Sequence, residues 1–180
     1  MIYTQQEMEC QAALHAAAQI CAAARTAPKT RGVDRIHTLV LTQSDKDALA
    51  SELERLSQVQ GIDFYARDAL NLRAAQAVAL IGTTEGQRGL GENCGYCHFG
   101  GCEGCAQAGG ACVFDAMDLG IALGSAAALA ADQRVDTRVM YSIGKAALSL
   151  GLMEPSVKII IAVPISVSGK SPFFDRKKKG

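Results

Sequence analysis

Apolar residues recur at helical spacing near the N-terminus of the chain. The i, i+4, i+7, i+11 positions within residues 5–24 are filled by Cys10, Leu14, Ala17 and Cys21. Such spacing marks one face of a helix, so we predict a helix over residues 5–24. Free cysteine packs well in an apolar core, and we therefore interpret Cys10 and Cys21 as core residues and not as ligands.

The rest of the chain alternates between helical and extended patterns. Pro28 and Gly32 mark a loop after the first helix. Apolar runs predict three strands, over residues 34–42, 76–83 and 157–165. Helical patterns predict a helix capped by Ser44 that reaches about residue 58, one from about residue 113 that contains Gly120-x-x-x-Gly124, and one over about 138–150. Helices with few strands indicate an α/β or α+β layered domain with a small sheet.

Residues 84–112 follow neither period and are rich in Gly and Cys. We predict a single domain over residues 1–180, in which residues 84–112 form an inserted loop that something other than apolar packing organises. A chain of 180 residues can bury an adequate apolar core without metal. A metal site in this loop would therefore serve a function and not only support the fold.

The charge and hydropathy of the chain exclude several classes of partner. The 18 Lys and Arg residues balance the 18 Asp and Glu residues, which argues against nucleic acid as a partner. The apolar stretches 12–24 and 119–131 are shorter than the ~20 residues of a membrane span, so no membrane is expected. The first residues lack the pattern of a secretion signal. We therefore expect a cytoplasmic protein, whose seven cysteines bind metal or do redox work more readily than they form disulfides.

Five of the cysteines form the most informative motif of the chain. They follow a Cys-x2-Cys-x4-Cys-x2-Cys pattern with a fifth thiol seven residues later, at Cys94, Cys97, Cys102, Cys105 and Cys112. Two thiolates in a Cys-x2-Cys step can bind one metal or cluster, and the glycines between them allow backbone amides to approach sulfur. Structural zinc usually has two pairs separated by a dozen or more residues, whereas four residues separate the pairs here. The spacing favours a four-iron, four-sulfur (4Fe–4S) cluster, with zinc as the alternative.

Four ligands are needed, and the motif supplies five. We predict Cys94, Cys97 and Cys102 as three of them. Cys112 is preferred as the fourth, because Cys105 follows Cys102 so closely that a single turn would have to direct both thiols at one cluster; Cys105 remains the alternative. His98 is more simply interpreted as a bystander than as a ligand.

Several long segments make the sequence similar to a known family. They read NCGYCHFGGC, GGACVFDAMDLGIALGSAAALAADQRVDTRVMYSIGKAALSLG, IIIAVPISVSGKSPFFDR and ARTAPKTRGVD. These segments resemble a prokaryotic family of uncharacterised proteins described as containing a ferredoxin domain. The resemblance implies a 4Fe–4S cluster on Cys94, Cys97, Cys102 and Cys112. His98 stands where the family would have Gly, and Cys105 is not a position of its pattern.

The order of the elements carries a second, weaker resemblance, to flavin mononucleotide (FMN)-dependent nitroreductases. It implies an α+β fold with a small antiparallel or mixed sheet packed by helices, and FMN bound at a homodimer interface. In that superfamily the loop after the first helix and a basic residue near the C-terminus hold the flavin phosphate. The resemblance makes phosphate candidates of Arg25, Lys29, Arg31, Lys170 and Arg176. Arginine suits a phosphate because it offers paired donors at fixed geometry.

Together these observations lead to three hypotheses about function. The first is a homodimeric, nitroreductase-like redox protein whose cluster exchanges electrons with a flavin, a partner protein or a small-molecule acceptor. The second is an electron carrier or redox sensor without flavin, and the third is a zinc-stabilised interaction module. No Ser-His-Asp set is recognisable, and the catalytic residues of an enzyme are not identified. Asp115 and Asp118 are interpreted as acidic residues that complement a helix N-terminus.

Overall fold

A four-stranded antiparallel sheet forms the centre of the protein, whose computed structural model describes residues 1–174. Its strand order is β1-β2-β4-β3, and the bounds are β1 (Ile36–Thr42), β2 (Ala77–Thr84), β3 (Asp136–Thr137) and β4 (Val157–Ser166). Strand β2 is buried at every position except its last. It pairs with β1 through Leu39 and Leu80 and with β4 through Leu80 and Ala162. The predicted small sheet is confirmed, and all its pairs are antiparallel.

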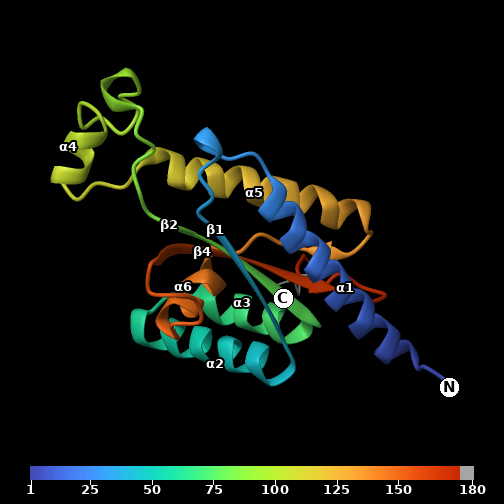
Figure 1. Ribbon diagram of the computed structural model, residues 1–180. Coiled ribbons are helices and arrows are strands. Elements are labelled where there is room, and N and C mark those ends of the chain that lie inside the picture. The colour runs from blue at the N-terminus through green and yellow to red at the C-terminus, as the bar shows by residue number, and fades with distance from the viewer. Residues whose placement is uncertain (175–180) are drawn as a thin grey trace.

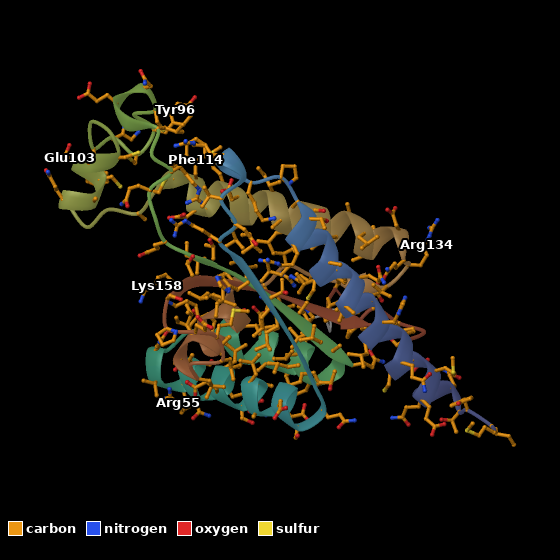
Figure 2. The ribbon with its side chains drawn as sticks, viewed as in Figure 1. Arg55, Tyr96, Glu103, Phe114, Arg134 and Lys158 are labelled. Carbon is orange, nitrogen blue, oxygen red and sulfur yellow. The ribbon has the colours of Figure 1, made fainter. Side chains whose placement is uncertain are left out.

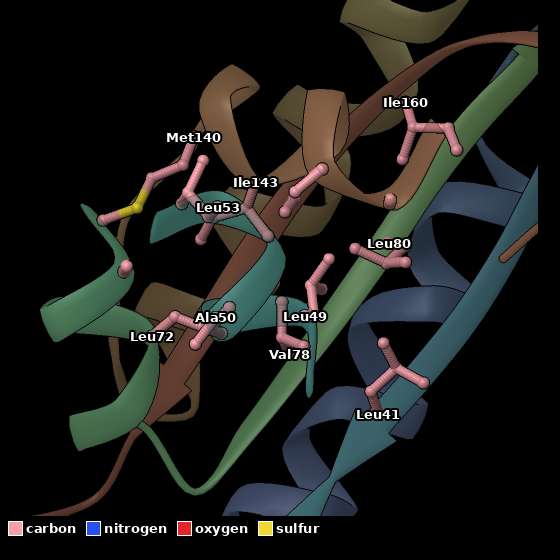
Figure 3. Packing of buried hydrophobic residues seen from close by; sticks show 14 of the residues in the cluster. Leu41, Leu49, Ala50, Leu53, Leu72, Val78, Leu80, Met140, Ile143 and Ile160 are labelled. Atoms are coloured by element: carbon pink, nitrogen blue, oxygen red, sulfur yellow. The ribbon is translucent and has the colours of Figure 1, made fainter. Parts of the chain in front are cut away.

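Helices cover both faces of the sheet (Figure 1). One face carries α1 (Gln5–Thr26) and α5 (Val113–Asp132), and the other carries α2 (Gln43–Gln60), α3 (Asp63–Ala74) and α6 (Tyr141–Ser149). Each layer has its own buried apolar cluster. The cluster on the α2, α3 and α6 side is built from branched side chains such as Leu53, Leu80 and Ile143, which are labelled in Figure 3. The α1 and α5 side is richer in alanine, which lets these two helices pack closely on the sheet.

Helix α1 begins with a capping box in which Thr4 and Glu7 exchange hydrogen bonds. Its buried face is formed by Ala13, Ala16, Ala17, Ile20 and Ala24. The prediction that Cys10 is a core residue is therefore wrong, because Cys10 is exposed. Leu14 is half exposed and Cys21 is only partly buried. Alanine occurs on all sides of this helix, so the apolar pattern alone did not define which side faces the sheet.

Other boundaries differ from the prediction in instructive ways. Helix α2 has Thr42 as its N-cap, so Ser44 lies inside the first turn and is not the cap. Helix α3 was not predicted, although its buried residues Tyr65, Ala69 and Leu72 have helical spacing. The two-residue strand β3 is too short to give a period in the sequence.

Helix α5 is longer than its most apolar stretch suggested. Its most apolar 18 residues have a mean hydropathy of 1.5, so the 20-residue helix is long and apolar enough, by length and composition, for a membrane span. The length argument made from residues 119–131 therefore does not apply to the complete helix. Core helices of soluble proteins have the same composition, and the inner face of α5 packs on the sheet and α1 through Leu119, Ala122 and Ala126.

Candidate metal centre

Residues 84–112 project from the layered domain beyond the N-terminal end of α5 (Figure 1). They contain the short helices η2 (Gly91–Asn93) and α4 (Cys102–Gln107). Figure 2 shows Tyr96 and Glu103 in the projecting part and Phe114 where it joins α5. The rings of Tyr96 and Phe114 lie 6.1 Å apart between centroids. We call residues 84–112 the cysteine segment.

The five cysteines of this segment surround one pocket. All five thiols are free, and Cys105 and Cys112 are buried while the other three are partly buried. The pocket is narrow, with a cavity volume of about 10 Å³, and part of it is open to solvent. Its remaining lining comes from Gln87, Arg88, Leu90, Gly91, Gly95, Gly101, Val113 and Phe114. The structure thus brings together every cysteine predicted as a ligand or an alternative ligand.

Cys102 faces a cradle of backbone amides. Gly89 and Gly91 have φ of 66° and 62°, and Leu90 between them has φ −83° and ψ −6°. Alternating left- and right-handed residues turn successive N–H groups toward one point, and such nests bind anions and iron–sulfur groups. Hydrogen bonds from the N–H of Gly91 and then of Leu90, Gly89 and Arg88 lower the pKa of the Cys102 thiol, against the opposing effect of burial. The cradle therefore favours the thiolate, which is the form that binds metal. We call residues 88–91 the nest.

Cys105 lies in a different environment within the same pocket. Burial raises the pKa of its thiol, the nearby thiols of Cys97 and Cys112 raise it further, and a hydrogen bond from Gln87 opposes them. Its Sγ donates to the carbonyl of Gly110 at 3.2 Å. Cys102 and Cys105 are three residues apart on α4, so one helical turn does direct both thiols into the pocket. The geometry removes the reason for ranking Cys105 below Cys112, and the fourth ligand remains a choice between them.

Side chains suited to one compact ion do not converge here. Within residues 1–174, no group of three or more His, Cys, Asp or Glu residues could hold a metal ion. Tetrahedral zinc with bonds of about 2.3 Å needs its thiolates only ~3.8 Å apart, whereas a four-iron cluster places each thiolate on a different iron. His98 is exposed and does not line the pocket. Its φ of 63° is a conformation that glycine adopts more readily.

A buried ion-pair network anchors the cysteine segment to the domain. Arg88, Asp115 and Asp118 are 3%, 1% and 2% exposed. Nη1 of Arg88 donates to Asp115 at 2.7 Å, and Nη2 donates to Asp118 at 2.9 Å. Asp115 also accepts from the N–H of Gly86, and Asp118 accepts from the N–H and the hydroxyl of Thr30. The network therefore ties α5 to two loops.

The network was missed in the sequence, where Asp115 and Asp118 were assigned only to a helix N-terminus. Their spacing of three residues puts both carboxylates on one face of α5, and that spacing was the available signal. Its partner, Arg88, is distant in sequence and lies in a segment without a period. Pairing the three residues required the fold.

Three of the basic residues predicted to hold a phosphate have partners within the chain. Arg25 pairs with Asp34 and donates to the carbonyl of Ile36. Lys29 donates to the carbonyls of Arg25 and Ala27. Arg31 donates to two carbonyls of the nest, those of Arg88 at 2.8 Å and Gly89 at 3.0 Å.

The two other phosphate candidates follow β4 in the sequence. Lys170 follows the end of β4, and its carbonyl accepts from the hydroxyl of Ser168. Arg176 lies outside the described residues. The five candidates therefore remain predictions. Arg25, Lys29 and Arg31, at the C-terminal end of α1 and just after it, contact different groups instead of one shared site.

Comparison with solved structures identifies the fold. A nitroreductase from Lactococcus lactis, solved with nicotinic acid, superposes with a TM-score of 0.60 at 17% identity, covering 94% of this chain and 81% of that one. An FMN-dependent nitroreductase from Mycobacterium smegmatis, solved with NADPH, gives 0.56 at 12% identity, covering 87% and 78%. A nitroreductase family protein from Clostridium novyi gives 0.56 at 12% identity, covering 97% and 79%. The predicted nitroreductase-like α+β fold is confirmed.

Comparison of sequences identifies the family. An uncharacterised protein of Archaeoglobus fulgidus is 41% identical over 164 residues, which is 87% of each chain. The model of a family described as uncharacterised proteins containing a ferredoxin domain matches residues 108–176, so it covers α5 and the C-terminal part of the sheet. The chain belongs to this family of ferredoxin domain-containing proteins.

Proposed function

We propose that the protein transfers electrons through a 4Fe–4S cluster held by Cys94, Cys97, Cys102 and a fourth thiolate, from Cys112 or alternatively Cys105. The observation that carries this proposal is the pocket itself, since all five thiols line it and the amides of the nest face one of them. The ferredoxin domain of the family and the nitroreductase-like fold both support a redox role. The balanced charge of the chain and its free cysteines fit a cytoplasmic protein.

The residues around the pocket suit a cluster better than a zinc ion. All five thiols line the pocket, and within residues 1–174 no group of three or more His, Cys, Asp or Glu side chains is arranged to hold a single metal ion. Leu90, Val113 and Phe114 add apolar surface that limits water, and the nest supplies N–H donors to sulfur. A bound cluster would accept and release single electrons. The role of the chain is to hold the thiolates, exclude water and set the potential.

A second proposal adds FMN, which would make the protein an oxidoreductase and not a carrier or sensor alone. It is supported by the likeness to an FMN-dependent nitroreductase and by the basic loop after α1. Arg25, Lys29 and Arg31 would have to exchange their present partners for a phosphate. This requirement makes flavin the less supported of the two cofactors.

We also propose that a second copy of the chain packs on α5. Met117, Gly120, Ile121 and Gly124 lie on one face of this helix at helical spacing, and all are exposed. Apart from the adjacent residues and backbone of α5 itself, no atom lies within 4 Å of the position that a side chain would take at Gly120 or Gly124, so another helix could approach closely. An Ile121→Arg variant should be monomeric by light scattering, whereas a Leu70→Arg variant on exposed α3 surface should remain dimeric. A monomeric wild-type protein would contradict the proposal.

The cofactor proposals are tested on protein purified without oxygen. We expect about four iron and four sulfide per chain and a broad visible absorption that dithionite bleaches. Stoichiometric zinc with no iron would overturn the proposed cluster and support the interaction module. Denaturation followed by fluorescence of the supernatant tests the second proposal, because only bound flavin would be released. Iron without flavin would leave an electron carrier or sensor.

A further inference from the structure

Arg31 contacts the carbonyl side of the nest, and the N–H groups of the nest face Cys102. Its Nη1 atom donates to the carbonyls of Arg88 at 2.8 Å and Gly89 at 3.0 Å. The same atom lies 3.0 Å from the position that a side chain would take at Gly89. The guanidinium and the nest therefore touch, although 57 residues separate them in the sequence.

The two carbonyls belong to peptides whose N–H groups lower the pKa of the Cys102 thiol. A peptide is a rigid plane with the carbonyl and the N–H at opposite ends. The carbonyl of Arg88 shares its plane with the N–H of Gly89, and the carbonyl of Gly89 shares its plane with the N–H of Leu90. Fixing the carbonyl ends fixes the direction of both N–H groups, and a cation on a carbonyl strengthens the hydrogen bond that the same peptide donates.

Other contacts hold the nest against Cys102 and Arg31 against the nest. Gly101, which precedes Cys102, packs against the backbone of Gly91 and Glu92. Thr30, which precedes Arg31, bonds to Asp118, and Asp118 bonds in turn to the Arg88 side chain. Arg31 itself has a φ of 57°, which is unfavourable for a residue with a side chain. Such a conformation persists where surrounding contacts impose it and often accompanies function.

We propose that Arg31 is a positioning residue of the cysteine pocket, which orients and polarises two peptides of the nest and thereby raises the reduction potential of the cluster. The proposal rests on the proposed cluster. A positive charge beside the nest and well-aligned N–H donors to sulfur both favour the reduced, more negative cluster. The assignment differs from the phosphate role that the sequence suggested for Arg31.

The test uses protein purified without oxygen and a redox titration followed by electron paramagnetic resonance. Arg31→Gly removes the guanidinium while suiting the backbone, since glycine adopts a φ of 57° readily. We expect about a tenfold shift of the redox equilibrium toward the oxidised cluster, which is about 59 mV for a one-electron couple. Arg31→Lys keeps a cation and should recover part of the shift.

Arg35→Ala is the matched control. Nη1 of Arg35 donates to the carbonyl of Glu85 at 2.7 Å, which is the same kind of bond on the same segment but outside the nest. This variant should leave the potential unchanged. Equal potentials in wild-type and Arg31→Gly protein, or equal shifts in Arg31→Gly and Arg35→Ala, would overturn the proposal.

Hydrogen exchange separates this proposal from the cluster assignment. In protein stripped of iron, Arg31→Gly should speed exchange at the amides of Gly89 and Leu90, and Arg35→Ala should not. Wild-type protein that never holds iron would refute the proposed cluster and the effect on its potential, and unchanged exchange in Arg31→Gly would refute the positioning of the nest.

Discussion

The layered domain and the cysteine segment are stabilised in different ways. The domain buries two apolar clusters, one on each face of the sheet. In the cysteine segment the buried residues are Arg88, Gly101, Cys105 and Cys112, none of which carries a large hydrocarbon side chain. The segment instead contains six of the nine described glycines with positive φ. Backbone turns, polar contacts and thiols organise it in place of an apolar core.

The difference indicates that the two regions should respond to different perturbations. Apolar burial supports the domain without help from a ligand. The cysteine segment contributes little burial, so its order should depend on the proposed cluster and on the Arg88 network that joins it to α5. Substitutions can therefore be chosen to affect the domain, the cysteine segment, or the Arg88 network that connects them.

Loss of a pocket thiol should affect the cysteine segment alone and should have the largest effect. In Cys102→Ala we expect nearly complete loss of iron, because the thiolate that the nest favours is removed. The domain should still unfold cooperatively, with its own transition little changed. Iron analysis and circular dichroism during thermal unfolding measure the two effects.

The control for this loss is Cys10→Ala. Cys10 is exposed on α1 and should keep full iron content. Comparison of Cys105→Ala with Cys112→Ala then identifies the fourth ligand as the position whose loss removes iron. Full iron content in Cys102→Ala would contradict the ligand assignment.

Removing the Arg88 ion pairs should affect both the domain and the cysteine segment. Arg88→Met leaves two buried carboxylates without their cation, which typically costs about 3–5 kcal/mol. We expect a lower free energy of unfolding, measured with denaturant, together with a lower iron content. Arg67→Met is the matched control, because Arg67 pairs with Asp68 but is 44% exposed. A change equal to that of the control would mean that the network does not anchor the segment.

A cavity in the domain should lower its stability and leave the pocket intact. Ile143 on α6 is completely buried in the cluster of Figure 3. Ile143→Ala should cost about 2–5 kcal/mol, since the removed methyl groups leave a void. Iron per folded chain should stay at the wild-type level. Leu70→Ala, at a 65% exposed position, should change neither quantity.

The sequence predicted the domain better than the segment for the same physical reason. Burial gives a continuous apolar run in a strand such as β2 and a helical period in α5, and both patterns can be recognised without knowing the partners. The prediction from apolar patterns failed on α1, because alanine on every side leaves the buried face undefined, and on β3, because that strand has only two residues. Helix α3 had the spacing and was overlooked.

The candidate site was predictable in composition but not in arrangement. The spacing of the cysteines was enough to group them, because neighbours in sequence must lie close in space. The nest depends on the dihedral angles of Gly89 and Gly91, and the contacts of Arg31 and Arg88 join residues that are distant in sequence. Such contacts leave no local pattern, so Arg31 suggested a phosphate ligand when only its charge was visible.

The smallest expected effect concerns an ion pair on the surface of the domain, far in sequence from the cysteine segment. Glu52 accepts two hydrogen bonds from Arg55 and one from Ser149, and these bonds lower its pKa to about 2. Because the unfolded value is about 4.3, the stabilising effect should be complete above that pH and should disappear as the pH falls toward 2. In Glu52→Gln we expect a loss of roughly 0.2–1 kcal/mol at pH 7, because Arg55 is 54% exposed and water screens the pair, although the Glu52 side chain is only 10% exposed.

Denaturant unfolding at pH 7 and pH 3 measures this difference between Glu52→Gln and the wild-type protein. It should be smaller at pH 3, because this pH lies below the unfolded pKa of about 4.3 and above the folded pKa of about 2, so the unfolded chain binds a proton that the folded chain does not. Iron content at pH 7 should be identical in both proteins, since the substitution changes neither the cysteine segment nor the Arg88 network. A difference in stability that does not change with pH would mean that the carboxylate charge is not its source. A loss of iron would contradict the independence of the two regions.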